Sequence, residues 1–309
     1  DAMLEAVQRY DVDGVHFDDF FYPYPEAGQD FPDGRSYARY ARAGQSRADW
    51  RRANVNTLVR EMNTRIKQLK PWVKFGISPF GIWRNARTDR GGSDTSGLES
   101  HDAIYADTRT WVRQGWLDYV VPQLYWAIGF ARADYAKVLP WWSKLVSGTN
   151  VQLYIGQGDY RVGEKGPWRD PGQLDRQLAL NDRYAVSGSV HFSAKQIRAD
   201  RLGAVTRYRN AHYATPALLP TMAHLPAQPP SAPRLVRAAG TALTWQAGES
   251  EPVSWALYRV DGAAATLVAT GRRGTPVTAP GPGTYCLSGL DRSGNEGPAG
   301  DPVTIPAAS

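Results

Sequence analysis

Five short β-prone runs that alternate with helix-like stretches constrain the fold of this chain more than any other feature. The runs begin near residues 14, 73, 117, 151 and 188, with the sequences GVHFDD, VKFGISP, LDYVVPQLYW, VQLYIG and GSVHFS. A strand that is followed each time by a helix can join a parallel neighbour through a crossover connection. The pattern therefore predicts an α/β domain with a parallel sheet covered by helices, either open or closed into a barrel.

Alternate positions along these runs divide into an apolar set and a polar or small set, which favours the barrel. We expect the apolar set to pack outward against helices: Val15, Phe17, Phe75, Ile77, Val120, Pro122 and Leu124. The inward set would be His16, Asp18, Gly76, Ser78, Val121, Gln123, Tyr125, Tyr154, Gly156, Ser189, His191 and Ser193. Its polar members gather toward the strand C-termini, where (β/α)₈ barrels build their active sites. An open doubly wound sheet should instead have a Gly-rich phosphate loop after its first strand, and none is present.

One long amphipathic stretch has clear start and stop signals. Between Asp49 and Lys70, apolar residues recur at helical spacing, namely Leu58, Val59, Met62, Ile66 and Leu69. We expect Asp49 to cap the start of this helix and Pro71 to stop it.

The chain changes character after residue 212. The segment YATPALLPTMAHLPAQPPSAP is rich in Pro and has no Asp, Glu, Lys or Arg, as is typical of an extended connector. We therefore expect three parts: a domain over residues 1–212, a Pro-rich linker over residues 213–232 and a second domain over residues 233–309.

The last part has the pattern of a small all-β sandwich. Short β-prone pieces (TALTWQ, SWALYRV, ATLVAT, GTYCLSGLD) are separated by Gly- and Pro-rich turns. This tail resembles a fibronectin type III-like module, in pattern rather than through a diagnostic motif. Cys286, the only cysteine, rules out an intrachain disulfide or a Cys-based zinc site, and we expect it to be a small core residue.

Charge and hydropathy exclude several classes of partner. The net charge of +6 is modest, and from residue 233 onward six Arg balance six acidic residues, so the surplus is too diffuse to indicate nucleic acid. No run of eighteen uncharged apolar residues is present, so we expect no membrane-spanning segment. His16 and His191 lie on distant runs without supporting carboxylates, so we expect no metal site. We also expect no cofactor, and a monomer.

Several ordered motifs carry a family resemblance. They are DVDGVHFDDFFYPYP, SRADWRRANVNTLV, KFGISPFGIWRN with GGSDT, YADTRTWVRQGWLDYVVPQLYW and the later LYIG. Residues 1–212 resemble the glycosyl hydrolase-like 10 family, once a domain of unknown function, which includes an envelope enzyme of division sites that acts on peptidoglycan glycan strands. The resemblance implies a (β/α)₈ glycosidase that acts on cell-wall glycan in the cell envelope or outside the cell.

The resemblance also implies that this sequence is a fragment. In the family the HFDD strand looks like the fourth of the barrel, so this chain would hold about strands 4 to 8, without the N-terminal strands. The runs start roughly 44 residues apart, so three further units would add about 130 residues upstream. We therefore expect five parallel strands in a curved, open sheet, in a fragment that can lack the activity of the complete barrel.

Glycoside hydrolysis usually needs two carboxyl groups. Asp18 is the strongest candidate, because it is inward, ends a strand and precedes aromatic residues; its alternative role is to cap the following turn. Asp19 should project to the opposite face, as a site residue or as support for one. The second carboxyl group would otherwise be loop-borne Asp94, helix-borne Asp107 or a residue further upstream.

Residues expected to bind the substrate lie at the same strand ends and in the loops that follow. They are His16, Tyr22, Ser78, Trp83, Arg84, Gln123, Tyr125, Trp126 and Tyr154. Polar groups beside aromatic rings suit sugar hydroxyl and acetamido groups and pyranose faces. Trp126 fits outward core packing equally well, and Arg84 fits an Arg lying over an aromatic surface.

The leading hypothesis is a glycosidase of cell-wall, peptidoglycan-type glycan with Asp18 as its principal carboxylate. Its rival is a non-catalytic carbohydrate- or wall-binding protein on a glycosidase-like barrel. A second inward carboxylate within about 5 to 10 Å of Asp18 separates the two. A polysaccharide deacetylase or other metal hydrolase would need a clustered His/Asp ligand set that this sequence does not display.

Overall fold

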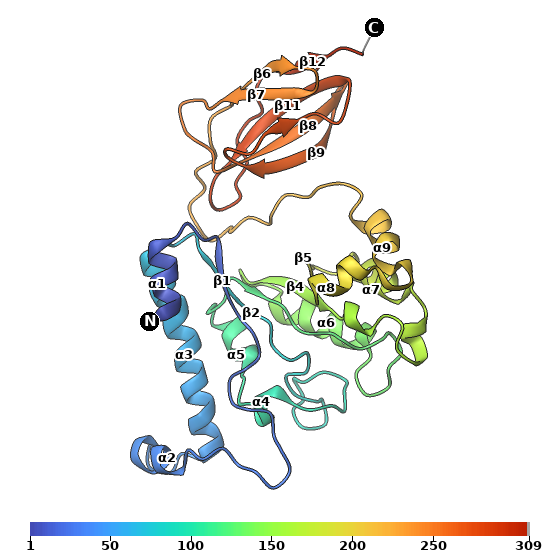
Figure 1. Cartoon of the computed structure of the whole chain (residues 1–309). Helices are drawn as coiled ribbons and strands as arrows, with labels where there is room; N and C mark the ends of the chain where they lie inside the picture. Colours follow the sequence, from blue (N-terminus) through green and yellow to red (C-terminus); the bar gives the residue numbers. More distant parts are fainter. Residues whose placement is uncertain (308–309) are drawn as a thin grey trace. The chain divides into compact units, whose positions relative to one another are not determined.

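A computed structural model describes residues 1–307, except for the side chains of residues 237 and 238. The chain divides into two compact units, Asp1–His212 and Tyr213–Ser309 (Figure 1). No helix in the described residues is both long and apolar enough to cross a membrane.

The first unit is built on one parallel sheet. Its strands are β1 (Gly14–Phe17), β2 (Lys74–Ile77), β3 (Tyr119–Val120), β4 (Gln152–Gln157) and β5 (Gly188–His191). They follow one another in chain order across the sheet, and each pairs in parallel with the next. The prediction of an α/β domain with five parallel strands is confirmed.

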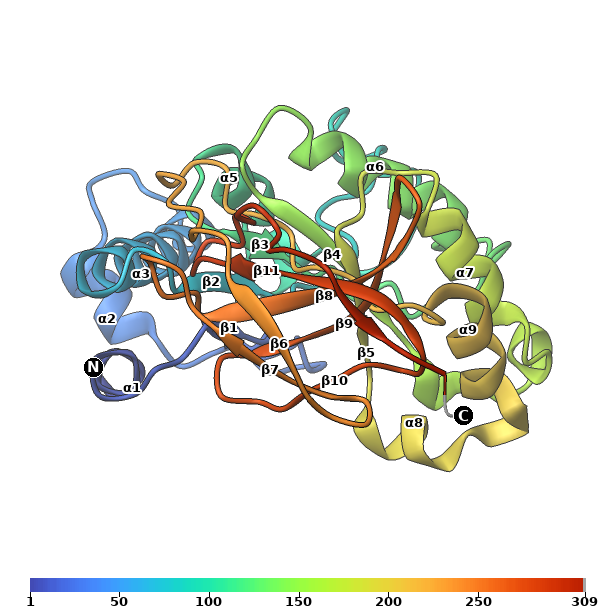
Figure 2. The same ribbon diagram turned by 90° about the horizontal axis from the view of Figure 1, so that it is seen from above.

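Helices connect successive strands and cover the outer face of the sheet. The α-helices are α1 (Ala2–Arg9), α2 (Gly34–Tyr40), α3 (Arg47–Leu69), α4 (Ser100–Ala103), α5 (Thr108–Arg113), α6 (Tyr135–Val146), α7 (Gln173–Asn181), α8 (Ala194–Ala199) and α9 (Ala204–His212). Short 3₁₀ turns occupy η1 (Asp159–Arg161), η2 (Gly166–Arg169) and η3 (Arg201–Gly203). Figure 2 shows α3, α5, α6 and α7 following one another around the strands, and each contacts the next. The sheet is therefore curled, with one face toward helices and one inner face.

The start of α3 differs from the expectation. The cap is Ser46, whose hydroxyl accepts the backbone N–H of Asp49 at 3.1 Å, so the helix begins at Arg47. Asp49 lies in the first turn, where its carboxylate accepts the Ser46 hydroxyl at 2.6 Å and faces the positive end of the helix dipole. The expected apolar face is only partly buried, because Leu58 and Leu69 are exposed.

The core lies between the outer face of the sheet and the helices, as the strand alternation predicts. Outward strand residues pack there against helix side chains in one cluster, which includes Val15, Phe75, Ile77, Val120, Leu124, Val59, Ile66, Trp111, Leu139 and Trp142. Side chains of the opposite parity are left on the inner face.

The last strand reverses the expected alternation. Ser189 and His191 pair with the helix-facing residues of β4, and Asn181 of α7 donates to the Ser189 hydroxyl at 3.4 Å. Both therefore face the helices, whereas Val190 and Phe192 are exposed on the inner face. The polar residues of β5 were expected to face inward, but they face the helices because they find hydrogen-bond partners inside the protein.

The second unit contains two antiparallel sheets. Its strands are β6 (Arg234–Ala239), β7 (Ala242–Gln246), β8 (Ser254–Asp261), β9 (Ala264–Arg272), β10 (Val277–Thr278), β11 (Gly283–Leu290) and β12 (Val303–Ile305). One sheet has the order β10-β7-β6 and the other β12-β11-β8-β9. Strands of both sheets share one core, with Leu235, Leu243, Trp255, Leu257, Val277, Tyr285, Leu287 and Ile305. Cys286 is buried in β11.

An ion pair between the partly buried Lys67 and the buried Asp118 ties α3 to the sheet. The Asp118 carboxylate accepts the Lys67 ammonium group at 2.6 Å and the Phe75 backbone N–H at 2.7 Å. The Lys67 ammonium group also donates to the Val73 carbonyl at 2.7 Å. A buried charge that loses its partner is far more costly than an exposed one.

We expect Asp118→Asn to destabilise the protein by about 3 kcal/mol, because the partly buried Lys67 ammonium group would lose its counter-ion. Glu5→Gln is the matched control, since it removes an exposed pair with Arg9 and should cost under about 0.5 kcal/mol. Urea denaturation of both variants measures the difference. Equal losses of unfolding free energy in the two variants would show that the Lys67–Asp118 pair contributes no more to stability than an exposed pair.

Candidate active site at the carboxyl ends of the strands

Asp18 follows β1 at the carboxyl end of the sheet and is exposed on the inner face. Its Oδ1 atom accepts three hydrogen bonds: from the Asp19 backbone N–H at 2.9 Å, the Ser78 hydroxyl at 3.1 Å and the Gln123 amide at 3.0 Å. No hydrogen bond from any described residue reaches Oδ2. One oxygen of the carboxylate is thus fixed by donors that follow three neighbouring strands, and the other is open to a ligand.

A hydrogen-bonded chain leads through His16 to this carboxylate. Ser78 donates to Asp18, so the contact of 3.0 Å between His16 Nε2 and the Ser78 hydroxyl places the imidazole proton on Nε2. Nδ1 then accepts the Tyr119 hydroxyl, 3.1 Å away. Burial lowers the pKa of His16, although the Asp18 charge opposes this, and burial raises the pKa of Tyr119 to about 12. A neutral imidazole and a protonated phenol are the forms this chain requires.

Gly76 makes room for the Tyr119 ring. A Cβ atom on Gly76 would lie 2.2 to 2.4 Å from three carbons of that ring. The ring lies nearly parallel to His16, with centroids 5.8 Å apart. Any larger residue at position 76 would displace Tyr119 and remove its hydrogen bond to His16.

Asp19 differs from Asp18 in the environment of its carboxyl group. Its side chain is buried, and its Oδ2 accepts the hydroxyl of Tyr24. Burial raises the pKa of Asp19; the Asp18 charge adds to this rise, and hydrogen bonds from Tyr24 and Gln123 oppose it. Two carboxyl groups thus lie near Gln123, and the one with the raised pKa, Asp19, has the property expected of a proton donor.

Aromatic rings continue from Asp19 along the strand ends. Tyr24 meets Phe80 edge to face at 6.4 Å, and Phe80 meets Trp126 in the same way at 5.5 Å. A Cβ atom on Gly81 would lie 2.7 Å from the Trp126 ring, so the absence of a side chain there lets this ring approach. Trp126 thus lies at the border between core and site: it is partly buried against the core, and its role in substrate binding stays a prediction.

Tyr125 and Tyr154 also lie on the inner face, Tyr154 within β4 and Tyr125 beyond the end of β3. Tyr125 packs against the rings of Tyr160 and Phe192, at 5.7 and 6.1 Å. Tyr154 lies within the sheet, edge to face with Tyr119 at 5.8 Å. It therefore supports the ring beneath the Asp18 chain.

Three of the expected site residues make their contacts away from Asp18. Trp83 is buried, and its indole N–H donates to Asp107 at 3.0 Å. Arg84 makes a two-point ion pair with Asp102, at 2.7 and 3.0 Å, with its guanidinium 6.0 Å from the Trp83 ring. Asp94 is exposed and pairs with Lys137 at 2.6 Å. None of these contacts joins the cluster around Asp18.

Asp107, the other alternative carboxylate, is a structural residue. It is the N-cap of α5, where its side chain accepts the Thr110 hydroxyl at 2.6 Å and backbone N–H at 3.4 Å. Its contacts with Trp83 and Thr110 stabilise the loop before α5.

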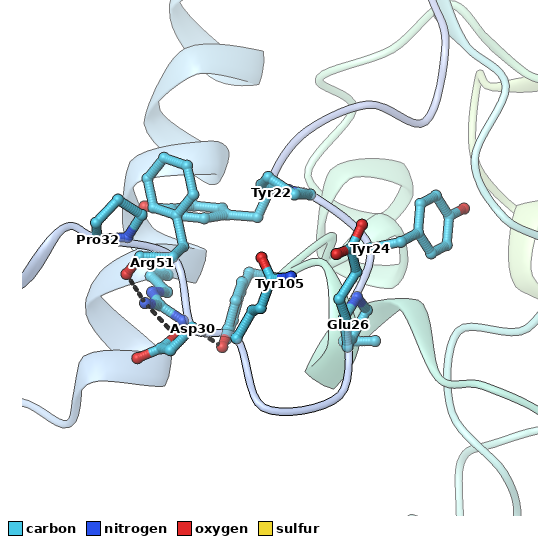
Figure 3. Close-up of a pocket in the computed structure, with 12 residues that line it drawn as sticks. Tyr22, Tyr24, Glu26, Asp30, Pro32, Arg51 and Tyr105 are labelled. Carbon is cyan, nitrogen blue, oxygen red and sulfur yellow. Dashed lines mark hydrogen bonds and ion pairs between the residues drawn. The ribbon is translucent and has the colours of Figure 1, made fainter.

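Tyr22 lines a pocket of about 230 Å³ between the loop after β1, Arg51 of α3 and Tyr105 (Figure 3). The Arg51 guanidinium lies 5.4 Å from the Tyr22 ring and 5.0 Å from the Tyr105 ring, and it pairs with Asp30 and Asp33. Arg51 thus fastens the loop to α3. In Figure 3 the Tyr24 ring points away from Arg51, and its hydroxyl meets Asp19.

Three residues near the site, Tyr119, Tyr24 and Phe80, were not among the residues expected from strand alternation. Tyr119 has the same parity as Gln123 and Tyr125, so its inward position was available from the sequence. Phe80 has the parity of Ser78, but it lies beyond the regular strand, and Tyr24 lies in a loop. Within residues 1–307, no three His, Cys, Asp or Glu side chains gather as a metal site would require.

We expect Asp19→Asn to stabilise the protein at neutral pH. The native state holds the Asp19 proton more tightly than the unfolded chain, so stability is lost as pH rises from the unfolded pKa near 3.8 through the raised native pKa. Asn keeps an acceptor for Tyr24 and removes the charge. Urea midpoints at pH 7 and pH 3.5 should show a gain that shrinks in acid, whereas the control Asp94→Asn should show no such gain. A loss at pH 7 would contradict the cost assigned to the charge.

Comparison with known proteins places the chain in a family. The family model described as glycosyl hydrolase-like 10 matches residues 1–171, which include Asp18, Ser78 and Gln123. Glycosyl hydrolase YngK of Bacillus subtilis is 44% identical over 284 residues, covering 87% of this chain and 56% of that protein. Glycosyl hydrolase DigH of Escherichia coli K12 is 44% identical over 198 residues, covering 62% of this chain and 45% of that protein.

The chain spans about half the length of the curated relatives it matches. An endo-beta-1,4-mannanase from Thermotoga petrophila aligns with 83% of this chain and 62% of its own, at 10% identity and a TM-score of 0.34, a likeness too slight to define a fold. The family match over more than half of the residues, together with the two glycosyl hydrolases, is specific. This chain belongs to the glycosyl hydrolase-like 10 family.

Proposed function

We propose that this protein is a glycosidase that cleaves glycan strands of the peptidoglycan type, with Asp18 as its principal catalytic carboxylate. The observation that carries the proposal is the fixed, exposed carboxylate of Asp18, held through Oδ1 by three donors. Its place at the carboxyl ends of parallel strands is where barrel enzymes bind substrates.

In this proposal the two carboxyl groups divide the work. Asp18, with Oδ2 open, acts as nucleophile or activates a water molecule, and Asp19, whose pKa is raised by burial, supplies the proton. The glycosidic oxygen takes that proton as its bond to the anomeric carbon breaks. If Asp18 activates the water, the water oxygen bonds to that carbon and Asp18 takes the water proton. If Asp18 is the nucleophile, water displaces it from the carbon and the ionised Asp19 takes the water proton. The chain from Tyr119 through His16 and Ser78 keeps Asp18 in its orientation.

The substrate class rests on the family and on the chemistry of the inner face. Family membership supports a glycan substrate. Amide and hydroxyl groups near Asp18 suit acetamido and hydroxyl groups, and the neighbouring rings suit pyranose faces. A cell-wall glycan is therefore the proposed partner, the cell envelope or the exterior is the proposed location, and the proposed state is a monomer.

We also propose that the five strands correspond to strands 4 to 8 of a (β/α)₈ barrel. Their unbroken parallel order and the helices on one face support this arrangement. Edge β1, which pairs only with β2 among the described strands, is where further barrel strands would add.

The second unit fits an accessory module of fibronectin type III-like architecture. Seven strands divide into sheets of three and four around one core. The Tyr285 hydroxyl donates to the Gly281 carbonyl at 2.9 Å, as in the tyrosine corner of immunoglobulin-like sandwiches. We propose that this unit helps to hold the protein on the wall.

One observation favours the alternative, a carbohydrate-binding protein without catalysis. Asp19 is only 6% exposed and is hydrogen-bonded to Tyr24, so Asp18 alone is open to a ligand. In that case glycan would bind beside Asp18 and remain intact.

The first test is Asp18→Asn in the protein as its gene encodes it. Asn keeps the volume but cannot act as nucleophile, acid or base, so release of reducing ends from peptide-free glycan strands should fall at least about a hundredfold. The melting temperature should change little, because Asp18 is exposed. Asp94→Asn is the matched control, since it also removes an exposed aspartate and should keep normal turnover.

Two results would contradict a catalytic role for Asp18. A normally folded Asp18→Asn protein that keeps a tenth or more of wild-type turnover would remove Asp18 from the chemistry. A wild-type protein that binds the strands without releasing reducing ends would favour the binding protein.

The second test removes residues 233–309. We expect turnover of soluble glycan fragments to stay within about twofold of the parent, because Asp18 and its partners lie in the first unit, while attachment to whole cell walls weakens. Reducing-end release and sedimentation with isolated walls measure the two effects. Loss of turnover on small soluble fragments by a folded deletion variant would contradict an accessory role.

A further inference from the structure

We propose that Tyr160 and Phe192, with Tyr125, form an aromatic platform that binds a sugar ring of the glycan next to Asp18. This inference rests on the proposed function, which supplies the glycan, and it extends that function to two residues outside the expected site. The platform lies beyond the ends of β3, β4 and β5, strands labelled in Figure 2.

The three rings form one compact group. The Tyr125 and Phe192 rings are stacked at 6.1 Å with 25° between their planes. Tyr160 stands edge-on to both, at 5.7 Å from Tyr125 and 6.2 Å from Phe192. Such mutual packing fixes the ring orientations before any ligand arrives.

Two of the rings remain open although they are large and apolar. Phe192 is 53% exposed and Tyr160 is 38% exposed. Clustered exposed aromatic rings are unusual on a protein surface and mark binding sites more often than isolated ones do. An aromatic face matches the C–H face of a pyranose, and the Tyr160 hydroxyl adds a polar edge for sugar hydroxyls.

The backbone beneath the platform is held firmly. The Phe192 N–H donates to the Gln157 carbonyl at 3.0 Å, and the Tyr160 N–H donates to the Phe192 carbonyl at 3.3 Å. These bonds join the segments after β4 and β5. Residues 160 and 192 are therefore kept side by side by main-chain contacts.

A buried polar group anchors both segments from the helix side. Asp159 precedes Tyr160, and His191 precedes Phe192 in the chain. The Asp159 carboxylate accepts the Tyr208 hydroxyl at 2.9 Å, and its other oxygen lies 2.9 Å from His191 Nδ1. His191 ends β5, and because neighbouring residues of an extended chain point to opposite faces, its burial turns the Phe192 ring to the inner face. Asp159 begins the 3₁₀ turn η1, and its buried carboxylate fixes the segment whose Tyr160 ring packs against Tyr125 and Phe192.

The platform is continuous with the carboxylate site. Tyr125 lies two residues after Gln123, the amide that donates to Asp18. The charges of Asp18 and Asp19 add to the effect of burial in raising the pKa of Tyr125. A glycan held at Asp18 would therefore meet the platform as it extends toward β5.

The experiment measures glycan binding without cleavage, in the Asp18→Asn background of the protein as encoded. The probe is soluble, peptide-free glycan strands, with other soluble β-linked oligosaccharides for comparison, and affinity is measured by calorimetry. Phe192→Leu and Tyr160→Leu keep apolar bulk but remove the rings, whereas Phe192→Tyr keeps a ring. Tyr40→Leu is the control, because Tyr40 is an exposed aromatic residue on α2.

We expect each Leu variant at position 160 or 192 to bind about three- to tenfold more weakly, as loss of one aromatic contact implies. Phe192→Tyr and Tyr40→Leu should bind within twofold of the parent, and all melting temperatures should stay close to it. If peptide-free strands do not bind but another glycan does, with the same dependence on the rings, the platform stands and the proposed substrate class falls.

Three outcomes would overturn the platform. The first is unchanged affinity in both Leu variants. The second is a large fall in melting temperature with affinity retained, which would identify the rings as core packing. The third is the absence of binding by every glycan tested.

Discussion

The parallel pairing of β1 with β2, and of β2 with β3, is the constraint on which the candidate site depends. His16 pairs with Gly76, so the next inward positions, Asp18 and Ser78, lie opposite each other. Gln123 reaches the same place from the segment after β3, through an isolated bridge to Phe80. A shift of one residue in either register would turn these side chains toward the helices and leave the carboxylate without its donors.

The two faces of the sheet differ in how they accommodate polar and aromatic side chains. The outer face is buried against helices, and polar groups on it find partners there, as His191 does with Asp159 of η1 and Ser189 with Asn181 of α7. The carboxyl end of the sheet keeps groups that are costly for stability, such as the buried Asp19 carboxyl group and the exposed ring of Phe192. Proteins commonly hold such groups where a ligand will use them.

Ion pairs away from the site hold these groups in place. Arg51 fastens the loop after β1 to α3, and that loop carries Tyr24 to Asp19. Lys67 and Asp118 join the same helix to the sheet. A rigid frame of this kind keeps the donors around Asp18 within hydrogen-bonding distance, as acid–base chemistry requires.

The sequence by itself determined the five strands, their outward apolar set and the inward positions of Asp18, Ser78 and Gln123, because strand alternation is a local property with a period of two. Only the tertiary structure decided which loop residues return to the site. Trp83 and Asp94 lie near strand ends in sequence, but Asp107 and Lys137 hold them elsewhere. The orientation of β5 was likewise decided by buried partners on the helix side, because strand alternation does not say which face a polar side chain takes and the available hydrogen-bond partners do.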